Sequence, residues 1–469
     1  MESQETRDES NCIRYQISKD VVLRPECFGG IVFQKNSGTI MEMDAEAFAV
    51  LEYIKYQGEI TKNDLNRYLA FNRIKPSLAY RTIQAFSRAE IISHRHVSID
   101  SIQLKRKIEN KNGPQKRRYQ NQNLDTISHA LSAPETVHWA ITYRCNEHCP
   151  DCYVGRYSKN FPTELSSFNA KRVIIRLADW GVLQVAIGGG EPLLRPDIVE
   201  LTHYTKMMGL MVHLTTGMQV ISPELMNALS VNLSSIQFGL RIKDCQQKLS
   251  GELQRISILI KNAMRSKLYT GVNVILSKSI IQNLESIVLS LLHIGVERII
   301  FLRYKPPADE LRWEAENPPG DLLLSVPGRL KKMEHNLKGI DIRLDCALSF
   351  LQPRLPYYVA RSFGLQGCTA ANRVVAMTPD GFLFPCSQLI DSRWKSGNIF
   401  ENDLKHAWKT NPVLQKIRAF RDQPTFQKGP CGTCGMVSQC GGCRIFAPDL
   451  LSSDLECPCI SSRLDKTLN

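Results

Sequence analysis

Three cysteines lie close together in the stretch TYRCNEHCPDCYVG, residues 142 to 155. Cys145, Cys149 and Cys152 follow the spacing Cys-x3-Cys-x2-Cys, and no fourth cysteine lies nearby. A structural zinc site prefers four protein ligands. An iron-sulfur cube that is held by three thiolates instead leaves one iron free to bind a small chelating molecule. The triplet therefore indicates a site for chemistry rather than a structural metal site.

The chain has 15 cysteines, and most of them fall in short-spaced groups. Disulfides are rare in a reducing compartment, so this number points to metal binding. Paired Cys-x2-Cys units also hold zinc in ribbons, but a ribbon leaves about 15 to 20 residues between its pairs. Only five residues separate Cys434 from Cys440, which favours iron-sulfur clusters over zinc. The isolated Cys12, Cys27 and Cys245 are expected to be buried or unreactive thiols.

Six β-branched runs between Val137 and Tyr304 alternate with runs of helical period such as NAKRVIIRLADWG and NLESIVLSLLHIG. This alternation predicts parallel strands joined by right-handed helical crossovers, in a sheet that curls toward a barrel. The carboxyl ends of such strands form one mouth, where the chemistry of a barrel takes place. The cysteine triplet follows the first strand and is therefore expected at this mouth. The expected strands are VHWAITY, LQVAIG, LMVHLTT, SSIQFGL, TGVNVILS and ERIIFLRY.

Two motifs of this region resemble signatures of the radical S-adenosylmethionine (SAM) enzymes. The triplet matches that family's cysteine loop, and GGGEP at 188 to 192 is similar to its second signature, at the end of the second strand. The resemblance implies a [4Fe-4S] cluster on the three cysteines, whose open iron is chelated by the amino and carboxylate groups of SAM. It also implies that Gly189, Gly190 and Glu191 line the methionine amino group. Glycines allow close backbone approach, and a carboxylate complements an ammonium.

Other predicted SAM contacts are polar residues at the ends of later strands. Thr215 and Thr216 end the third strand in the segment TTG, and Asn273 and Arg303 are expected to end two later strands. Turn chemistry explains such residues equally well.

The sequence departs from the family pattern at two places. The family usually has an aromatic residue or histidine before its third cysteine, where this chain has Asp151. It often has Ser and Asp on the fourth strand, where this chain has FGLR with Gly239 and Arg241. These differences leave the adenine and ribose contacts unassigned.

The C-terminal cysteines resemble the SPASM domain, an extension of radical SAM enzymes that modify peptides, which binds up to two auxiliary [4Fe-4S] clusters. The similarity begins with the spacing Cys-x12-Gly-x4-Cys, which ends at Cys386. One departure is that only Gly441 and Gly442 separate the last two cysteines of CGTCGMVSQCGGC, where the family usually has three residues, so a slight displacement of the last ligand is expected. The resemblance implies one cluster on Cys368, Cys386 and Cys443 with Cys346 as a candidate fourth ligand, and another on Cys431, Cys434, Cys440 and either Cys457 or Cys459.

Residues 20 to 100 begin with three short extended runs, VVLRP, GGIVFQKN and TIMEMD, joined by turn residues. Three runs of helical period follow, with Thr61 and Ser77 as expected N-caps. The pattern predicts a small winged-helix-like α+β unit. Taken alone, such a unit is also compatible with DNA binding.

The same region is similar to the PqqD-like peptide-recognition domain, which captures the leader segment of a ribosomally made precursor peptide. The resemblance implies that a leader pairs its backbone with the exposed edge of TIMEMD. DNA binding is the less favoured alternative, because Tyr80, Ile83 and Phe86 are mixed among the basic residues of the last helix.

The chain has a net charge of +13, and seven of its basic residues lie in a polar stretch before the barrel, between residues 105 and 118. A solvated tether is favoured over a nucleic-acid patch, because Tyr119 is the only aromatic residue among these charges. The N-terminus is polar and acidic, and no apolar run reaches the roughly 18 residues of a membrane span, so a soluble, cytoplasmic protein is expected. The basic residues of the stretch are Lys105, Arg106, Lys107, Lys111, Lys116, Arg117 and Arg118.

These features together predict an α/β protein, a radical SAM/SPASM maturase that modifies a ribosomally synthesised precursor peptide. We expect a leader-recognition domain at 18–100, a basic linker at 101–130, a partial (β/α)6 barrel at 131–310 and a bridging segment with the SPASM domain at 311–469. A carbon-sulfur or carbon-carbon cross-link is the favoured product, with excision of a tyrosine-derived fragment to a ketoamide second. A non-enzymatic redox sensor that binds peptide or DNA is the other class. The expected electron donor is a reductant such as flavodoxin or ferredoxin.

Overall fold

The computed structural model describes residues 13–96, 130–147, 149–156, 163–241, 249–307, 309–356 and 367–460. The chain divides into two compact units, residues 1–131 and 132–469. Nearly all of the predicted basic linker lies outside the described residues, as do Cys12 and Cys245.

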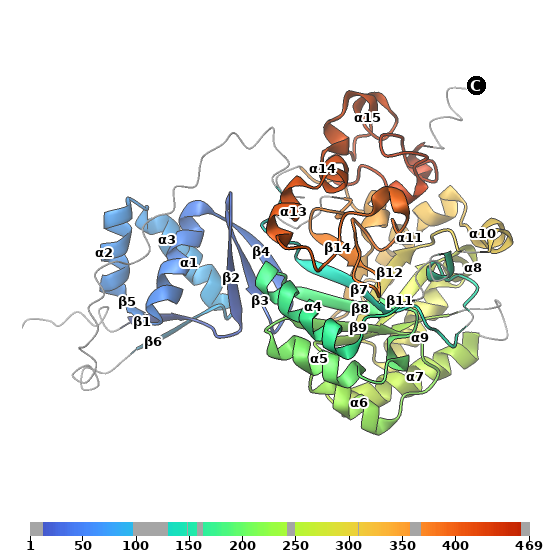
Figure 1. The fold of residues 1–469 in the computed structure, drawn as a ribbon, viewed down its shortest axis with the longest axis horizontal. Coiled ribbons are helices and arrows are strands. Elements are labelled where there is room, and N and C mark those ends of the chain that lie inside the picture. The colour runs from blue at the N-terminus through green and yellow to red at the C-terminus, as the bar shows by residue number, and fades with distance from the viewer. Residues whose placement is uncertain are drawn as a thin grey trace, which may run out of the picture. The chain divides into compact units, whose positions relative to one another are not determined.

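The described part of the first unit contains two small sheets and three helices (Figure 1). β2 (Val21–Glu26), β3 (Gly29–Gln34) and β4 (Thr39–Asp44) form an antiparallel sheet in the order β2-β3-β4. The helices are α1 (Ala45–Gln57), α2 (Lys62–Asn72) and α3 (Pro76–Arg88). These elements match the predicted strands and helices, except that α3 ends at Arg88 and is shorter than its run of helical period, which continued to Ser93. The second sheet, which the sequence did not predict, pairs β5 (Ile60–Thr61), β1 (Ile13–Ile17) and β6 (Ile92–His96) in that order.

The helix starts of this unit follow local side-chain chemistry. Asp44 caps α1 by accepting a hydrogen bond from the Ala47 N–H at 2.8 Å. Thr61 caps α2 in a reciprocal box with Asp64, as the sequence predicted. The prediction of Ser77 as a cap is wrong, because α3 begins one residue earlier at a proline, whose missing N–H is no loss at the first helical position.

The second unit is built on a parallel sheet whose six central strands are those predicted from the sequence. Along one face of β7, Val137 and Trp139 are at most 1% exposed and pack into the core, while the alternating residue His138 is partly exposed. The six strands lie in sequential order and are β7 (Thr136–Thr142), β8 (Gln184–Gly189), β9 (Met211–Thr216), β10 (Ser235–Gly239), β11 (Thr270–Leu276) and β12 (Arg298–Arg303).

Helices follow these strands and cover the sheet (Figure 1). Their apolar faces, for example Val173 and Leu177 of α4, join one large core with the strand residues. The helices are α4 (Ser167–Trp180), α5 (Ile198–Met207), α6 (Pro223–Ser230), α7 (Leu249–Arg265), α8 (Lys278–Gln282) and α9 (Leu284–Ile294).

The sheet is wider than the predicted barrel, because the C-terminal part of the chain adds strands to both of its edges. β13 (Asp341–Leu344) pairs in parallel with β12, and β14 (Val374–Met377) pairs in parallel with β7. β15 (Leu383–Phe384) then pairs with β14, so the sheet has nine strands among the described residues. An open six-stranded sheet would leave two rows of unpaired backbone groups, which these strands cover.

The remaining described elements of this unit are short helices. The α-helices are α10 (Glu310–Glu316), α11 (Gly320–Lys332), α13 (Leu404–Thr410), α14 (Pro412–Ala419) and α15 (Pro424–Lys428). The 3-10 helices are η3 (Val154–Arg156), η5 (Pro192–Leu194), η6 (Cys346–Leu351), η7 (Ser392–Trp394), η8 (Phe420–Asp422) and η9 (Arg444–Phe446).

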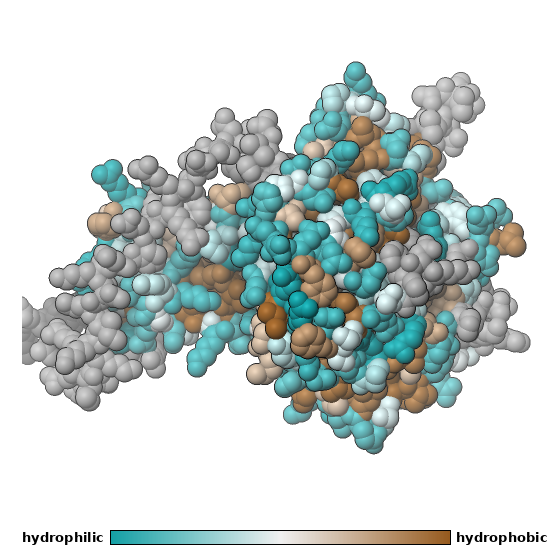
Figure 2. All heavy atoms as spheres, in the orientation of Figure 1, coloured by the Kyte–Doolittle hydropathy of each residue, from teal (hydrophilic) through white to brown (hydrophobic). Residues whose placement is uncertain are grey.

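None of the helices in the described ranges combines the length and apolar character that crossing a bilayer requires. Figure 2 shows polar residues interspersed with apolar ones over the visible face.

Across three neighbouring strands, His213 forms a polar bridge. Its Nδ1 lies 2.8 Å from the Ser235 hydroxyl on β10, and its Nε2 lies 2.8 Å from Oε1 of Gln184 on β8. Burial lowers the pKa of His213 to about 4, and the charges of Arg298 and Arg343 contribute in the same direction. The imidazole is therefore neutral in the folded protein at neutral pH.

We expect His213 to make folding pH-dependent between pH 7 and 5. Because the folded-state pKa is lowered, the neutral imidazole stabilises the folded protein at pH values above the unfolded-state pKa of 6.5, and this stabilisation is lost as the pH falls toward 4. Between pH 7 and pH 5 the free energy of unfolding should fall by about 2 kcal/mol. Urea unfolding at both pH values should show this drop in the wild type and a drop smaller by that amount in His213→Gln. Equal drops in the two proteins would contradict the assignment.

Candidate active site

The GGGEP segment lies directly against the start of the cysteine loop. The Gly190 N–H donates to the Thr142 carbonyl at 2.8 Å, and the Glu191 N–H donates to the Arg144 carbonyl at 2.8 Å. A Cβ at Gly189, where φ is +110°, would lie 2.4 Å from the Thr142 oxygen, and one at Gly190 would lie 2.3 Å from the Arg144 oxygen. Only glycines allow this contact, which joins the two motifs at the carboxyl ends of β7 and β8.

Glu191 is 1% exposed and is oriented by three hydrogen bonds. Its carboxylate accepts from the Leu193 N–H at 3.0 Å, the Thr216 hydroxyl at 2.9 Å and the Gly217 N–H at 2.8 Å. Burial raises the pKa of Glu191, and these hydrogen bonds offset only part of that effect. Thr216 therefore holds Glu191, whereas the neighbouring Thr215 is exposed.

Arg241, which sequence reasoning noted only as a departure, reaches into the cysteine loop. Its Nη1 donates to Glu147 at 2.6 Å and lies 3.8 Å from the Cys149 sulfur. Its Nε and Nη2 are buried and have no hydrogen-bond partner in the described chain, although Glu252 lies 3.9 Å from Nε. These two nitrogens form one edge of the guanidinium, which suits bidentate binding of a carboxylate. The signal in the sequence was a charged residue two positions after a strand end.

Glu191 and Arg241 face the same small space beside Gly217. A Cβ at Gly217 would lie 3.9 Å from the Glu191 carboxylate and 3.8 Å from Nη1 of Arg241. An anionic and a cationic group that face the same space complement the ammonium and the carboxylate of an amino acid. The residues present therefore fit the methionine part of SAM.

Two of the predicted SAM contacts differ from the expectation, Asn273 in its place in the strand and Arg303 in its partner. Asn273 does not end its strand: it is the fourth residue of β11, which continues to Leu276 because its later residues still pair with β12. Its buried Oδ1 has no hydrogen-bond partner among the described residues. Arg303 does end β12, but its guanidinium binds both carboxylate oxygens of Asp454, at 2.6 and 3.1 Å. A contact of Arg303 with SAM stays a prediction. Such a contact would compete with this ion pair for the guanidinium.

A repeated backbone feature marks six of the predicted cysteine ligands. In each, the amide two residues later donates a hydrogen bond to the cysteine sulfur, for example Glu147 to Cys145 at 3.4 Å. Hydrogen bonds of this kind stabilise a thiolate and tune an iron-sulfur cluster. The other five sulfur acceptors are Cys386, Cys434, Cys440, Cys443 and Cys457.

Four of the C-terminal thiols gather at one place. Burial raises the pKa of the Cys346 thiol, and Asp345, Cys368, Cys443 and Cys386 raise it further. The residue is nevertheless accessible to solvent. The structure therefore brings the candidate fourth ligand to the three cysteines of the first predicted auxiliary site.

The second predicted auxiliary group is closely packed. Burial raises the pKa of Cys440 to about 11, and its neighbours Asp454 and Cys431 raise it as well. A Cβ at Gly442 would lie 3.0 Å from the Cys431 sulfur. Of the two alternative ligands, Cys457 is buried and Cys459 is only partly so.

The shortened Gly441–Gly442 spacing is accommodated by backbone conformation. Both residues have positive φ, +71° and +75°, which only glycine adopts without strain. The turn is tight enough that Cys443 still reaches the group around Cys346. No set of three or more His, Cys, Asp or Glu side chains in the described ranges is arranged for a single metal ion.

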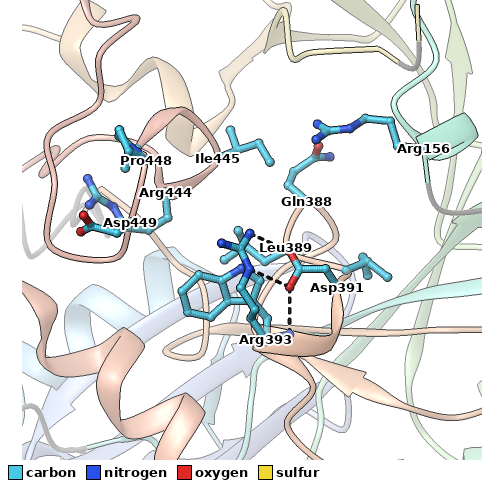
Figure 3. A pocket seen from close by; sticks show the side chains of 12 residues that line it. Arg156, Gln388, Leu389, Asp391, Arg393, Arg444, Ile445, Pro448 and Asp449 are labelled. Atoms are coloured by element: carbon cyan, nitrogen blue, oxygen red, sulfur yellow. Dashed lines mark hydrogen bonds and ion pairs between the residues drawn. The ribbon is translucent and has the colours of Figure 1, made fainter.

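A pocket of about 250 Å³ lies beside the cysteine segments (Figure 3). Arg156 follows the cysteine loop, Gln388 follows Cys386, and Ile445 follows Cys443. None of the predicted site residues lines it, and no pattern in the sequence pointed to it. Its other lining residues are Leu389, Ile390, Asp391, Arg393, Trp394, Arg444, Ala447, Pro448 and Asp449.

The fold and these sites define an iron-sulfur enzyme with a radical SAM barrel. Residues 139–241 match the radical SAM superfamily, and residues 368–441 match SPASM, an iron-sulfur cluster-binding domain. The chain is a radical SAM enzyme that binds SAM and a [4Fe-4S] cluster and carries a cluster-binding SPASM domain.

Proteins similar to this chain include a maturase and a heme synthase. The mycofactocin maturase MftC of Mycobacterium ulcerans is 26% identical over 330 residues, which cover 68% of this chain and 85% of that protein. The AdoMet-dependent heme synthase of Methanosarcina barkeri is 26% identical over 340 residues, which cover 67% and 93%. Among solved structures, Streptococcus suis SuiB bound to SAM has the same fold, with a TM-score of 0.70 at 20% identity over 94% of this chain and 99% of that one.

Replacing Glu191 by Gln should weaken SAM binding without loss of iron. Removing a charge-assisted contact costs about 1.5 to 3 kcal/mol, or one to two decades in affinity. Equilibrium dialysis of SAM with the cluster-loaded protein measures this change. Glu285→Gln on α9 is the matched control and should bind SAM like the wild type. Unchanged affinity in Glu191→Gln would remove this residue from the site.

The three cysteine groups should lose their iron independently of one another. Alanine at Cys145, Cys149 and Cys152 together should remove about four irons and all SAM cleavage. Alanine at Cys346 and Cys443 should remove another set of about four while the SAM-site cluster persists. Iron analysis and electron paramagnetic resonance (EPR) spectra test this, with Cys27→Ala as the control. Loss of all iron in any one variant would contradict separate sites.

Proposed function

We propose that this enzyme is a maturase that modifies a ribosomally synthesised precursor peptide. The observation that carries the proposal is the first unit, in which β4 is an edge strand of the sheet β2-β3-β4 among the described residues. Such an edge suits capture of an extended peptide by strand addition. SuiB, whose structure with its precursor peptide SuiA covers 94% of this chain at a TM-score of 0.64, and the maturase MftC support the same interpretation.

Within the barrel, we assign the SAM-site cluster to Cys145, Cys149 and Cys152, and the methionine part of SAM to Glu191 and Arg241. When bound, the cluster and SAM supply a 5′-deoxyadenosyl radical, which abstracts a hydrogen atom from carbon. The chain itself must hold the peptide carbon close to that radical and exclude water.

The two remaining cysteine groups are proposed to hold auxiliary clusters, with Cys346 as the fourth ligand of one and Cys457 as that of the other. Cys457 is favoured over Cys459 because it is buried and accepts the backbone hydrogen bond described above. Cys457→Ala should therefore lower the iron content more than Cys459→Ala.

A cross-link between carbon and sulfur or between two carbons is the reaction we favour. Forming such a bond after hydrogen abstraction breaks an S–H or C–H bond and releases one proton and one electron. The clusters proposed on the two further cysteine groups would accept the electron. Inversion of a stereocentre releases no electron and leaves those groups without a role. Excision of a tyrosine-derived fragment to a ketoamide is the second choice. A flavodoxin or ferredoxin is the proposed electron donor.

Deleting residues 1–100 should abolish modification of the full precursor peptide and leave SAM cleavage to 5′-deoxyadenosine nearly intact. The first unit holds none of the predicted cluster ligands, so its contribution is to raise the local concentration of the peptide at the barrel. Mass spectrometry of the peptide and chromatography of 5′-deoxyadenosine measure the two activities.

The isolated first unit should bind labelled leader peptide and prefer it to duplex DNA. A proline at Met41 or at Met43 of β4 should weaken binding where that N–H faces the leader, because proline removes a backbone donor. Arg67→Ala on α2, which removes an exposed side chain, is the control. Full modification by the truncated enzyme, or a preference for DNA, would overturn the peptide interpretation.

A further inference from the structure

The short helix α10 holds the cysteine loop through an ion pair. Nε and Nη2 of Arg312 donate to the two carboxylate oxygens of Asp151 at 2.7 and 3.1 Å. The Tyr304 hydroxyl, just after β12, donates to the same carboxylate at 2.9 Å. Asp151 directly precedes Cys152, so these contacts fix the backbone beside a predicted cluster ligand. Both side chains of the ion pair are less than a fifth exposed, at 18% and 17%.

The next residue of α10 contacts the C-terminal cysteine segment. Trp313 stacks on Tyr304 with ring centroids 5.3 Å apart, and its other neighbour is Phe446 at 6.1 Å. Phe446 is three residues after Cys443 and packs on the Arg303 guanidinium at 3.9 Å. One turn of helix therefore contacts both the loop that carries Cys152 and the segment that carries Cys443.

Further contacts keep α10 itself in place. Glu316, which lies 3.6 Å from Arg312, accepts hydrogen bonds from the Ser279 N–H at 3.1 Å and the Ser279 hydroxyl at 2.6 Å. Asn317, at the end of the helix, donates to Glu456 at 2.9 Å. The seven-residue helix is thereby anchored to the start of α8 and to the C-terminal segment.

We infer that Arg312 is a positioning residue for the SAM site, and that Trp313 holds the C-terminal cysteine segment in a fixed position relative to the same helix. Arg312 acts through Asp151 and not by touching SAM. In the described part of the cysteine loop, Glu147 is held by Arg241 and Asp151 by Arg312, so the loop is tied on both sides of Cys149. A displacement of about 1 Å in such a site costs up to a hundredfold in rate. The inference does not depend on which substrate the enzyme modifies.

The test uses the full-length, cluster-loaded enzyme with Arg312→Gln, Arg312→Lys and Asp151→Asn. Arg312→Gln and Asp151→Asn should each raise the SAM dissociation constant about tenfold, which corresponds to about 1.4 kcal/mol. They should also alter the EPR spectrum of the reduced cluster with SAM, while the iron content stays unchanged. Arg312→Lys should recover part of the affinity. The double variant should be no weaker than either single one, because both remove the same contact.

Arg329→Gln is the matched control, because Arg329 forms a comparable ion pair with Glu285 between α11 and α9. It should leave SAM affinity and the EPR spectrum unchanged. A role in stability alone would lower the unfolding temperature of Arg312→Gln without changing SAM affinity or the spectrum. That result, or an equal loss of affinity in the control, would overturn the inference for Arg312.

Hydrogen-deuterium exchange separates the two halves of the inference. Arg312→Gln should speed exchange in residues 145–153 alone. Trp313→Ala should speed exchange there and in residues 443–446, because Trp313 lies against Phe446. Unchanged exchange at 443–446 in Trp313→Ala would remove the proposed link to the C-terminal segment.

Discussion

The arrangement of the second unit depends on the buried ion pair between Arg303 and Asp454. Both side chains are nearly inaccessible, at 3% and 0% exposed, and Asp454 also accepts a hydrogen bond from the Cys443 N–H at 3.0 Å. Removing one partner of such a pair costs about 3 to 5 kcal/mol, because the other charge stays buried. The pair therefore joins the end of a barrel strand to the backbone of a predicted cluster ligand and determines where the C-terminal cysteines lie.

At two places in this unit, glycines allow irregular backbone to hold cysteine thiols. At the SAM site, glycines at 189 and 190 let the second strand end touch the cysteine loop. In the C-terminal segment, Gly441 and Gly442 turn the chain sharply enough to place neighbouring cysteines in two different groups. In both places a Cβ would collide with protein atoms. The thiols are therefore positioned by backbone that only glycine allows, and the amides that follow the cysteines are free to donate to sulfur.

Local patterns in the sequence identified the six central strands, the N-terminal strands and helices, and the cysteine groups. They failed where a choice depends on a distant partner. β13 and β14 are only four residues long and exist as strands because the edges of the barrel sheet are available to them. Asn273 was expected at a strand end because it is polar, yet β11 continues past it through pairing with β12. Ser77 was expected as a cap, but the preceding proline starts the helix.

The sequence by itself determined the class of chemistry, because the spacing of cysteines and glycines along a loop limits which cofactor that loop can hold. It also indicated six parallel central strands, since six β-branched runs alternate with runs of helical period. Only the tertiary structure decided which residues meet across long separations. The sequence offered Cys346 only as a candidate ligand and Arg241 only as a departure from the family pattern, and the structure placed both beside thiols. The contact of Arg312 with Asp151, at a separation of 161 residues, leaves no trace in local sequence. The reason is physical: a long side chain selects its partner only after folding has buried its charge and brought an opposite one within reach.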